Sequence, residues 1–174
     1  MLKGDHIVLR YIAADDLPAL HRWINDRELV LFNAPYKPVS DFEQQRWFEA
    51  IGGRNDIFAF GIRSLEGDKL IGSCQLLNVS FIHRSADLQI RLGDRAEQGL
   101  GYGTEAVQLL LDFGFKDLNL NRICLHVFKT NMRAIRSYEK VGFVKEGLLR
   151  KGAHIDGKYI DIVVMGILRE EYGK

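Results

Sequence analysis

The chain has 174 residues, of which 47 % are hydrophobic, and this size and composition are typical of one globular domain. Its 24 Lys and Arg against 23 Asp and Glu leave a net charge of +1, so it lacks the basic excess of a nucleic-acid-binding protein. No apolar run approaches the ~20 residues that span a bilayer, and the N-terminus lacks the apolar segment of a signal peptide. We therefore expect a single domain over residues 1–174 that is cytoplasmic and binds neither nucleic acid nor membrane.

The first ninety residues predict a strand, two helices and then three strands. Residues 6–12 alternate in polarity as a half-buried strand does, and Asp15 is expected to cap the helix that follows. Ser40 with Glu43 three residues later has the pattern of a capping box, which predicts the start of the second helix. Apolar runs at 55–64, 69–79 and 85–93 predict three strands, with a hairpin turn between the first two.

The second half predicts a helix, a strand, a helix and a hairpin, at residues 104–118, 122–128, 131–142 and 148–168. Asn131 is placed to cap the second of these helices and Gly142 to end it in a left-handed conformation. The dipeptide Asp156-Gly157 tolerates the positive φ angles of a tight hairpin turn. This order of elements predicts a mixed sheet with helices on its faces.

Two cysteines, Cys74 and Cys124, each lie within an apolar run. Two cysteines about fifty residues apart are too few for a disulfide framework or a metal site. We expect both to be inert buried thiols, and we expect no bound metal.

Residues 94–110 read DRAEQGLGYGTEAVQLL, where Gly99, Gly101 and Gly103 alternate and lead into an apolar helix pattern. Three interpretations compete: a flexible loop without a ligand, a dinucleotide-binding turn, and a pyrophosphate cradle of another kind. The dinucleotide fingerprint needs G-x-G-x-x-G and an acidic residue closing the next strand, and the chain has neither.

A pyrophosphate cradle is the interpretation we favour for this loop. Successive N–H groups from Gln98 to Thr104 would converge on an anion at a helix N-terminus, where unpaired amides and the helix dipole favour negative charge. Gly101 and Gly103 have no Cβ to hold phosphates away. Because acidic residues precede the loop, the cradle is expected to depend on backbone amides rather than on cationic side chains.

The loop from Gln98 to Gly103 resembles the Q/R-x-x-G-x-G/A signature of the GNAT N-acetyltransferase superfamily, whose loop binds the pyrophosphate of acetyl-CoA. The stretch N-x-x-A-x-x-x-Y-x-K-x-G-F from Asn131 to Phe143 resembles the second cofactor segment of that family. The resemblance covers nearly the whole chain. It is closest to ribosomal-protein N-terminal acetyltransferases and spermidine N-acetyltransferases.

This resemblance implies an α/β (α+β) GNAT fold: one domain with a mixed, mostly antiparallel sheet of about seven strands, helices on both faces, and a splayed parallel strand pair. It implies acetyl-CoA as cosubstrate, no metal, and direct transfer of the acetyl group to a primary amine in a ternary complex. The expected cofactor-binding residues are Ile90, Arg91, Leu92, Gln98, Gly99, Leu100, Gly101, Tyr102, Gly103, Thr104, Asn131 and Tyr138.

The chemistry needs a proton donor for the departing thiolate and a group that takes the proton of the amine. Tyr138 is the expected general acid, since a phenol stays protonated near neutral pH and the family has a tyrosine at this position. Asp87, on the strand at 85–93, is the tentative base. His126 and a path through water with no single base remain alternatives.

The acceptor is expected to be a protein N-terminus or a small amine, with residues 25–50 walling its site. A polyamine such as spermidine and an amino sugar or antibiotic are the alternative acceptors. This stretch is less acidic than in spermidine acetyltransferases, which argues against polyamine specificity. A catalytically silent acyl-CoA-binding module is the non-enzyme alternative, and Tyr138 argues against it. The family also implies a homodimer.

Overall fold

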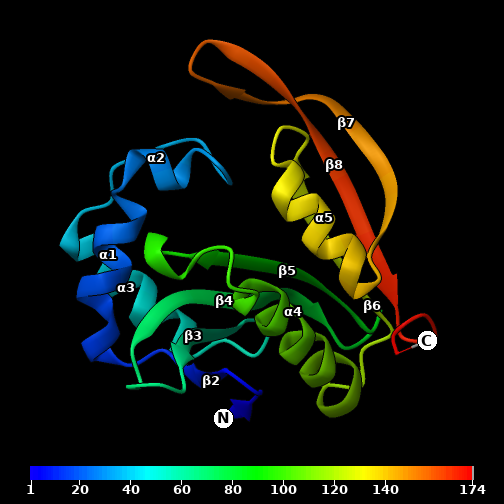
Figure 1. The fold of residues 1–174 in the computed structure, drawn as a ribbon, viewed down its shortest axis with the longest axis horizontal. Helices are drawn as coiled ribbons and strands as arrows, with labels where there is room; N and C mark the ends of the chain where they lie inside the picture. The colour runs from blue at the N-terminus through cyan, green and yellow to red at the C-terminus, as the bar shows by residue number, and fades with distance from the viewer. Residues whose placement is uncertain (174) are drawn as a thin grey trace.

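The structure, a computed structural model, describes residues 1–173 and contains one eight-stranded sheet in the order β1-β2-β3-β4-β5-β6-β8-β7 (Figure 1). Every neighbouring pair is antiparallel except β5 and β6, which are parallel. The strands are β1 (Leu2–Lys3), β2 (Ile7–Tyr11), β3 (Phe58–Ser64), β4 (Leu70–Ser80), β5 (Ser85–Leu92), β6 (Arg122–Phe128), β7 (Val144–Ile155) and β8 (Lys158–Leu168).

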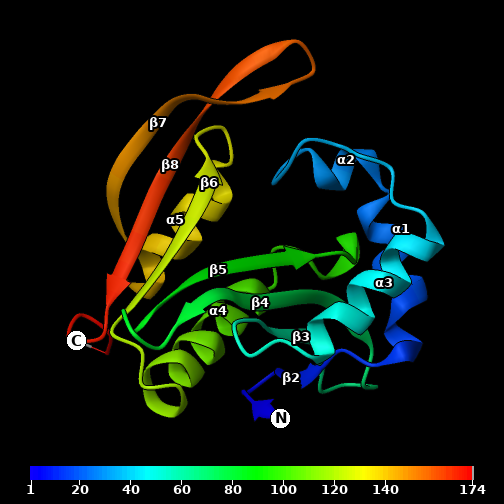
Figure 2. The same ribbon diagram turned by 180° about the vertical axis from the view of Figure 1, so that it is seen from behind.

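Helices cover both faces of the sheet, with α4 and α5 on one side and α1 and α3 on the other (Figures 1 and 2). Short 3-10 turns, η1 and η2, precede α1 and the glycine loop, and a π-helical turn, η3, continues α4. No helix within residues 1–173 is long and apolar enough to cross a membrane. The helical segments are η1 (Ala14–Asp16), α1 (Leu17–Ile24), α2 (Arg27–Val30), α3 (Asp41–Gly52), η2 (Arg95–Glu97), α4 (Tyr102–Asp112), η3 (Phe113–Asp117) and α5 (Met132–Val141).

The core lies between the sheet and the pair α4 and α5. Ala86 and Leu88 on one face of β5 are 3 % exposed, and Leu110 and Leu111 of α4 are fully buried. The opposite face of β5 therefore carries its polar side chains, since successive residues of a strand point to opposite sides.

The strands β5 and β6 separate along their length. They share only three residue pairs, from Ser85 with Arg122 to Asp87 with Cys124. Beyond this point β5 continues to Leu92 and β6 continues to Phe128 without a common ladder. The edge of β5 that would face β6 is therefore open from residue 88 onward, which confirms the expected splayed parallel pair.

Several local predictions hold. Ser40 accepts from the backbone N–H of Glu43, while the Glu43 carboxylate accepts from the Ser40 N–H, as a capping box requires. Asn131 caps α5 through a hydrogen bond from the Ala134 N–H, and Gly142 ends the helix at φ 109°. The turn at Asp156 and Gly157 has positive φ at both residues.

Others were wrong in detail. The predicted cap Asp15 lies inside η1, and the residue before α1 is Asp16, whose carboxylate instead bonds the Ala13 N–H and the Arg63 guanidinium. The sheet has eight strands, in keeping with the expected count of about seven, and the two-residue strand β1 pairs with β2 at its edge. The short helix α2 was not predicted, since four residues are too few to show a periodic pattern.

Candidate active site

The glycine loop opens directly onto the N-terminus of α4. Gly99 and Gly101 have φ of 86° and 91°, a conformation that other residues adopt at a cost. A Cβ built on either would meet no protein atom within 4 Å, because both line an open groove of about 380 Å³. A side chain at Gly101 would therefore occupy space in the groove rather than space in the protein.

The amides of this loop are free to bind an anion. Within residues 1–173, no backbone N–H from Gly99 to Thr104 finds a protein acceptor. The two acids that precede the loop, Asp94 and Glu97, both pair with Lys69, whose hydrogen bond to Asp94 is the main cause of the lowered pKa of that carboxyl. Their negative charge is thus offset locally, and the positive end of α4 faces the groove.

Cationic side chains complete the opposite wall of the groove. Arg133, Arg136 and Lys140 of α5 all line it. The expectation that the cradle depends on backbone amides rather than on cationic side chains stays a prediction, and it did not foresee these cations. Their spacing in the sequence could have predicted this cationic face, because residues three and then four apart on a helix lie on the same side of it.

Ten of the twelve expected cofactor-binding residues line this groove: Ile90, Arg91, Leu92, Gln98, Gly99, Gly101, Gly103, Thr104, Asn131 and Tyr138. Leu100 and Tyr102 do not line it. The side chain of Leu100 is 60 % exposed, and that of Tyr102 packs against the core. These two residues contribute to the loop through their backbones.

Two polar residues of the groove hold its walls together. Gln98 donates to the Leu92 carbonyl at the end of β5 and accepts from Arg133 of α5. Asn131 uses its oxygen to cap α5, and its amide nitrogen donates to the Phe32 carbonyl, 3.3 Å away. Both side-chain groups of Asn131 thus have protein partners, which favours its structural role over a contact with the cofactor.

A second cavity, of about 430 Å³, lies beside the groove, between β4, β5 and β6 of the sheet and the helices α1, α3 and α5. Four aromatic side chains line it: Trp23 of α1, Trp47 of α3, Phe128 of β6 and Tyr138 of α5. Asn33, Ile90, Arg91 and Tyr138 line both spaces, so the two meet at these residues. A molecule in the groove and a molecule in the cavity would be in contact there.

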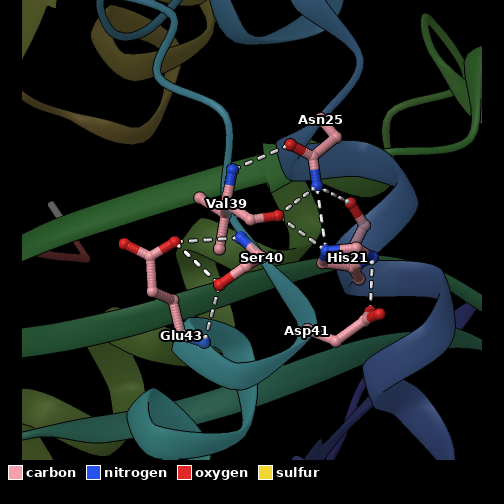
Figure 3. A network of polar contacts seen from close by, with 6 residues as sticks. All are labelled: His21, Asn25, Val39, Ser40, Asp41 and Glu43. Atoms are coloured by element: carbon pink, nitrogen blue, oxygen red, sulfur yellow. Dashed lines mark hydrogen bonds and ion pairs between the residues drawn. The ribbon is translucent and has the colours of Figure 1, made fainter.

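One wall of the cavity is fixed by hydrogen bonds between α1 and the start of α3 (Figure 3). Asn25 donates to the Val39 carbonyl and accepts from the Val39 N–H, and His21 Nε2 donates to the same carbonyl at 2.7 Å. Val39 and Glu43 both line the cavity. The predicted region 25–50 therefore does form a wall of this second site.

Tyr138 is placed at the junction of the two spaces. Burial raises its pKa to about 12, so the phenol is protonated at neutral pH. Its ring packs edge-on against Phe143, 5.8 Å between centroids. The hydroxyl has no hydrogen-bond partner among residues 1–173 and is open to the cavity, so it is free to donate to a ligand.

Asp87 lies apart from this junction. Its two carboxylate oxygens accept from Cys124 Sγ at 2.9 Å and from Asn78 Nδ2 at 2.7 Å, at the last paired residues of β5 and β6. It lines neither the groove nor the cavity, whereas Gln89 and His126 line the cavity. His126 thus shares a cavity with Tyr138, whereas Asp87 does not.

The two cysteines differ in their surroundings. Cys74 is 3 % exposed and its thiol pKa is raised by burial, as expected of an inert thiol. Cys124 is half-buried, and desolvation first and its bond to Asp87 second raise its pKa to about 12. Within residues 1–173, no three His, Cys, Asp or Glu side chains are grouped as metal ligands.

Comparison with known proteins agrees with this geometry. Residues 6–144 match the acetyltransferase (GNAT) domain family. The chain is 33 % identical over 171 residues to the spermidine N(1)-acetyltransferase of Vibrio cholerae, covering 97 % of this chain and 96 % of that one. It is 29 % identical over 103 residues to the putative ribosomal N-acetyltransferase YdaF of Bacillus subtilis, covering 59 % and 56 %.

Solved structures give the same result. The crystal structure of the Vibrio cholerae spermidine N-acetyltransferase in complex with CoA and spermine superposes with a TM-score of 0.88 at 32 % identity, covering 97 % of this chain and 98 % of that one. Both the resemblance stated from the motifs and the expected fold are thereby confirmed. The chain belongs to the GNAT acetyltransferases and is an acetyl-CoA-dependent N-acetyltransferase that acts on an amine.

Proposed function

We propose that the chain transfers the acetyl group directly to a primary amine in a ternary complex, with Tyr138 as the general acid. The observation that carries this proposal is the position of Tyr138, which lines both the groove and the cavity with an unbonded hydroxyl. A covalent acyl-enzyme is not part of the proposal, because the buried thiol Cys74 and the thiol of Cys124, whose pKa is about 12, lack the activation that a nucleophile needs.

The groove fits acetyl-CoA in its charge and its shape. The free amides of residues 99–104 and the cations Arg133, Arg136 and Lys140 would hold the phosphates. The open edge of β5 at Ile90 to Leu92 would bind the pantetheine amides, and a backbone N–H there would polarise the thioester carbonyl. Bound acetyl-CoA supplies the thioester whose acetyl group is transferred.

The transfer forms a carbon–nitrogen bond and breaks the carbon–sulfur bond. The amine nitrogen gives up a proton, and the departing sulfur receives one from the Tyr138 hydroxyl; the proton lost by the amine, passed on through solvent, restores that hydroxyl. Asp87 remains a candidate for the base, and with both oxygens bonded it would accept the proton through water. His126 is the rival because it lines the cavity. Comparing Asp87→Asn with His126→Gln in the pH dependence of kcat/KM separates the two.

The acceptor is a small amine or a protein N-terminus that enters the cavity of about 430 Å³. Relatives named as spermidine N(1)-acetyltransferases keep a polyamine as the alternative acceptor. An amino sugar or antibiotic is a further alternative.

The test is release of free thiol from acetyl-CoA across a panel of amines, with wild type and Tyr138→Phe compared on each. We expect release with at least one primary amine and a large loss in the variant on every accepted amine. No release with any amine, together with retained binding of CoA, would identify a silent acyl-CoA-binding module instead.

A homodimer and a cytoplasmic location stay predictions. The edge strand β7 exposes Val144, Leu148 and Leu149, and Phe32 and Phe42 of the 25–50 region are 62 % and 70 % exposed. These apolar surfaces are compatible with a second copy. Light scattering at high micromolar concentration should give the mass of a dimer, and a strict monomer would contradict the prediction.

A further inference from the structure

Arg91 is a cationic side chain at the junction of groove and cavity. It follows Gln89 on the face of β5 that points away from the core, and its register partner on β4 is Ser73. It is one of the four residues that line both the groove and the cavity. Arg91 and Tyr138 therefore both line the space in which cofactor and acceptor would meet.

The guanidinium of Arg91 stands without a partner in the described part of the chain. None of its N–H groups finds an acceptor among residues 1–173, and its Nε is sealed from solvent. Burial lowers the pKa of this side chain. A buried donor without an acceptor costs stability, and a charged one costs more. The two terminal nitrogens are not sealed, and Arg91 lines the cavity, so an anion bound by them would offset that cost.

The remaining charge of the cavity does not suit a polycation. Glu43 is the single carboxylate among the described residues that line it. That carboxylate already accepts from the Ser40 N–H and hydroxyl, and Lys37 Nζ lies 3.5 Å away (Figure 3 shows the Ser40 bonds). A polyamine would bring several positive charges to a cavity with one engaged carboxylate and one free cation, which is unfavourable.

The other residues that line the cavity favour an acceptor whose side chain is apolar. Trp23 packs so closely on Gly93, the residue after β5, that a Cβ built there would lie 1.9 Å from its indole ring. The contact of Trp23 with Gly93 is two residues along the chain from Arg91, so this part of the cavity has an aromatic wall. Trp47 and Phe128 add further apolar surface.

We propose that the acceptor is an amino acid or a similar small molecule, with an apolar body, a primary amine and a nearby carboxylate that Arg91 binds. This inference rests on the proposed function and narrows its acceptor. A guanidinium binds a carboxylate through two parallel hydrogen bonds, which fixes the position of the ligand as well as its charge. Arg91 would hold the carboxylate so that the amine points to the thioester beside Tyr138.

The experiment compares three acceptors of related size by thiol release from acetyl-CoA at one pH: leucine, leucinamide and spermidine. Leucinamide keeps the shape of leucine without the negative charge, and it also imitates a protein N-terminus. We expect kcat/KM for leucine to exceed that for leucinamide by about 10- to 100-fold, the range for a charge-assisted pair, and to exceed that for spermidine as well.

Arg91→Gln should abolish the preference for leucine over leucinamide by raising the KM for leucine, and Arg91→Lys should keep part of it. KM for acetyl-CoA should stay within about threefold in both variants. Arg10→Gln is the matched control, since Arg10 is an arginine that pairs with Asp68 at the surface and lines neither space. It should behave as wild type.

Two results would overturn the inference while leaving acetyl transfer intact. One is a higher kcat/KM for spermidine or leucinamide than for leucine. The other is an Arg91→Gln variant that raises KM for acetyl-CoA and leaves the order of acceptors unchanged, which would assign Arg91 to the cofactor. If no acceptor releases thiol, the proposed function fails separately. Equilibrium binding of leucine to the CoA complex, expected in wild type and lost in Arg91→Gln, then still decides the inference.

Discussion

The cofactor groove and the acceptor cavity are built in different ways. The groove is made largely of two short stretches, residues 98–104 and 131–140, with the end of β5 between them. Its ligand-facing groups are backbone amides and three cations on one helix. The cavity collects side chains from α1, the segment before α3, α3 itself, β3, β4, β5, β6 and α5. Most of its lining is apolar or aromatic.

The difference follows from the two ligands. A pyrophosphate presents the same charge and shape to every protein that binds it, and a glycine loop at a helix N-terminus is a local solution that a short motif can encode. An acceptor amine is recognised by the shape and charge of a cavity, and that cavity needs residues far apart in the chain. Tyr138 and Arg91 line both spaces, so changes at these positions test how the cofactor groove and the acceptor cavity work together.

Removing the Tyr138 hydroxyl should have the largest effect. Tyr138→Phe keeps the packing against Phe143 and should lower kcat by roughly 10²–10⁴-fold, the usual range for a general acid. KM for acetyl-CoA should change little, because the lost hydrogen bond forms in the transition state. Single-turnover kinetics measures the chemical step directly. A variant within threefold of wild type would make Tyr138 a packing residue of the junction.

A side chain added at the glycine loop should weaken the binding of CoA and leave the acceptor cavity unchanged. CoA at about 100 times its dissociation constant should stabilise the wild type by about 2.7 kcal/mol. Gly101→Val should abolish most of that gain, because its branched side chain enters the groove. Gly67→Val is the matched control: Gly67 also has a positive φ, 78°, with open space around it, but it lies outside the groove.

Thermal unfolding with and without CoA measures both variants. Each should lose stability without ligand, since valine is strained at a positive φ. Only Gly67→Val should keep the gain from CoA. An equal gain in Gly101→Val would show that the phosphates do not bind at the loop.

The burial of Tyr138 should be measurable in alkaline solution. Its pKa is raised from about 10 in the unfolded chain to about 12 in the folded protein, so the folded state holds the phenolic proton more tightly. The resulting stability is complete below pH 10 and is lost as pH rises through 12. Between these values the wild type should lose on the order of 2 kcal/mol more of its unfolding free energy than Tyr138→Phe does. Denaturant unfolding at pH 10 and pH 12 measures this difference. Equal losses of unfolding free energy in the two proteins would mean that the phenol is exposed to water.

Removing one cation from α5 should have the smallest effect. Arg136→Gln should raise KM for acetyl-CoA about threefold to tenfold at low salt, since one charge-assisted bond to a phosphate is lost. The difference from wild type should shrink as salt screens the groove. The order of acceptor preference should not change. A change in that order would mean that the α5 cations also belong to the acceptor cavity.

The sequence by itself determined the local features of this protein. The capping box of Ser40 and Glu43, the Asn131 cap, the Gly142 terminus and the Asp156-Gly157 turn each depend on a few neighbouring residues, and each was predicted. The glycine loop and the position of Tyr138 were predicted for the same reason. The predicted cap Asp15 was wrong because the chain first forms the turn η1 over Ala14–Asp16, and α1 begins only after it.

Only the tertiary structure decided the chemistry around these motifs. It placed the α5 cations across from the loop, and it bonded Asp87 to Cys124 and Asn78 away from the cavity. It also left Arg91 without a partner among residues 1–173 where groove and cavity meet, while Glu43 became engaged in its capping box. Such outcomes depend on which side chains from distant segments come together, and spacing along the chain does not record that.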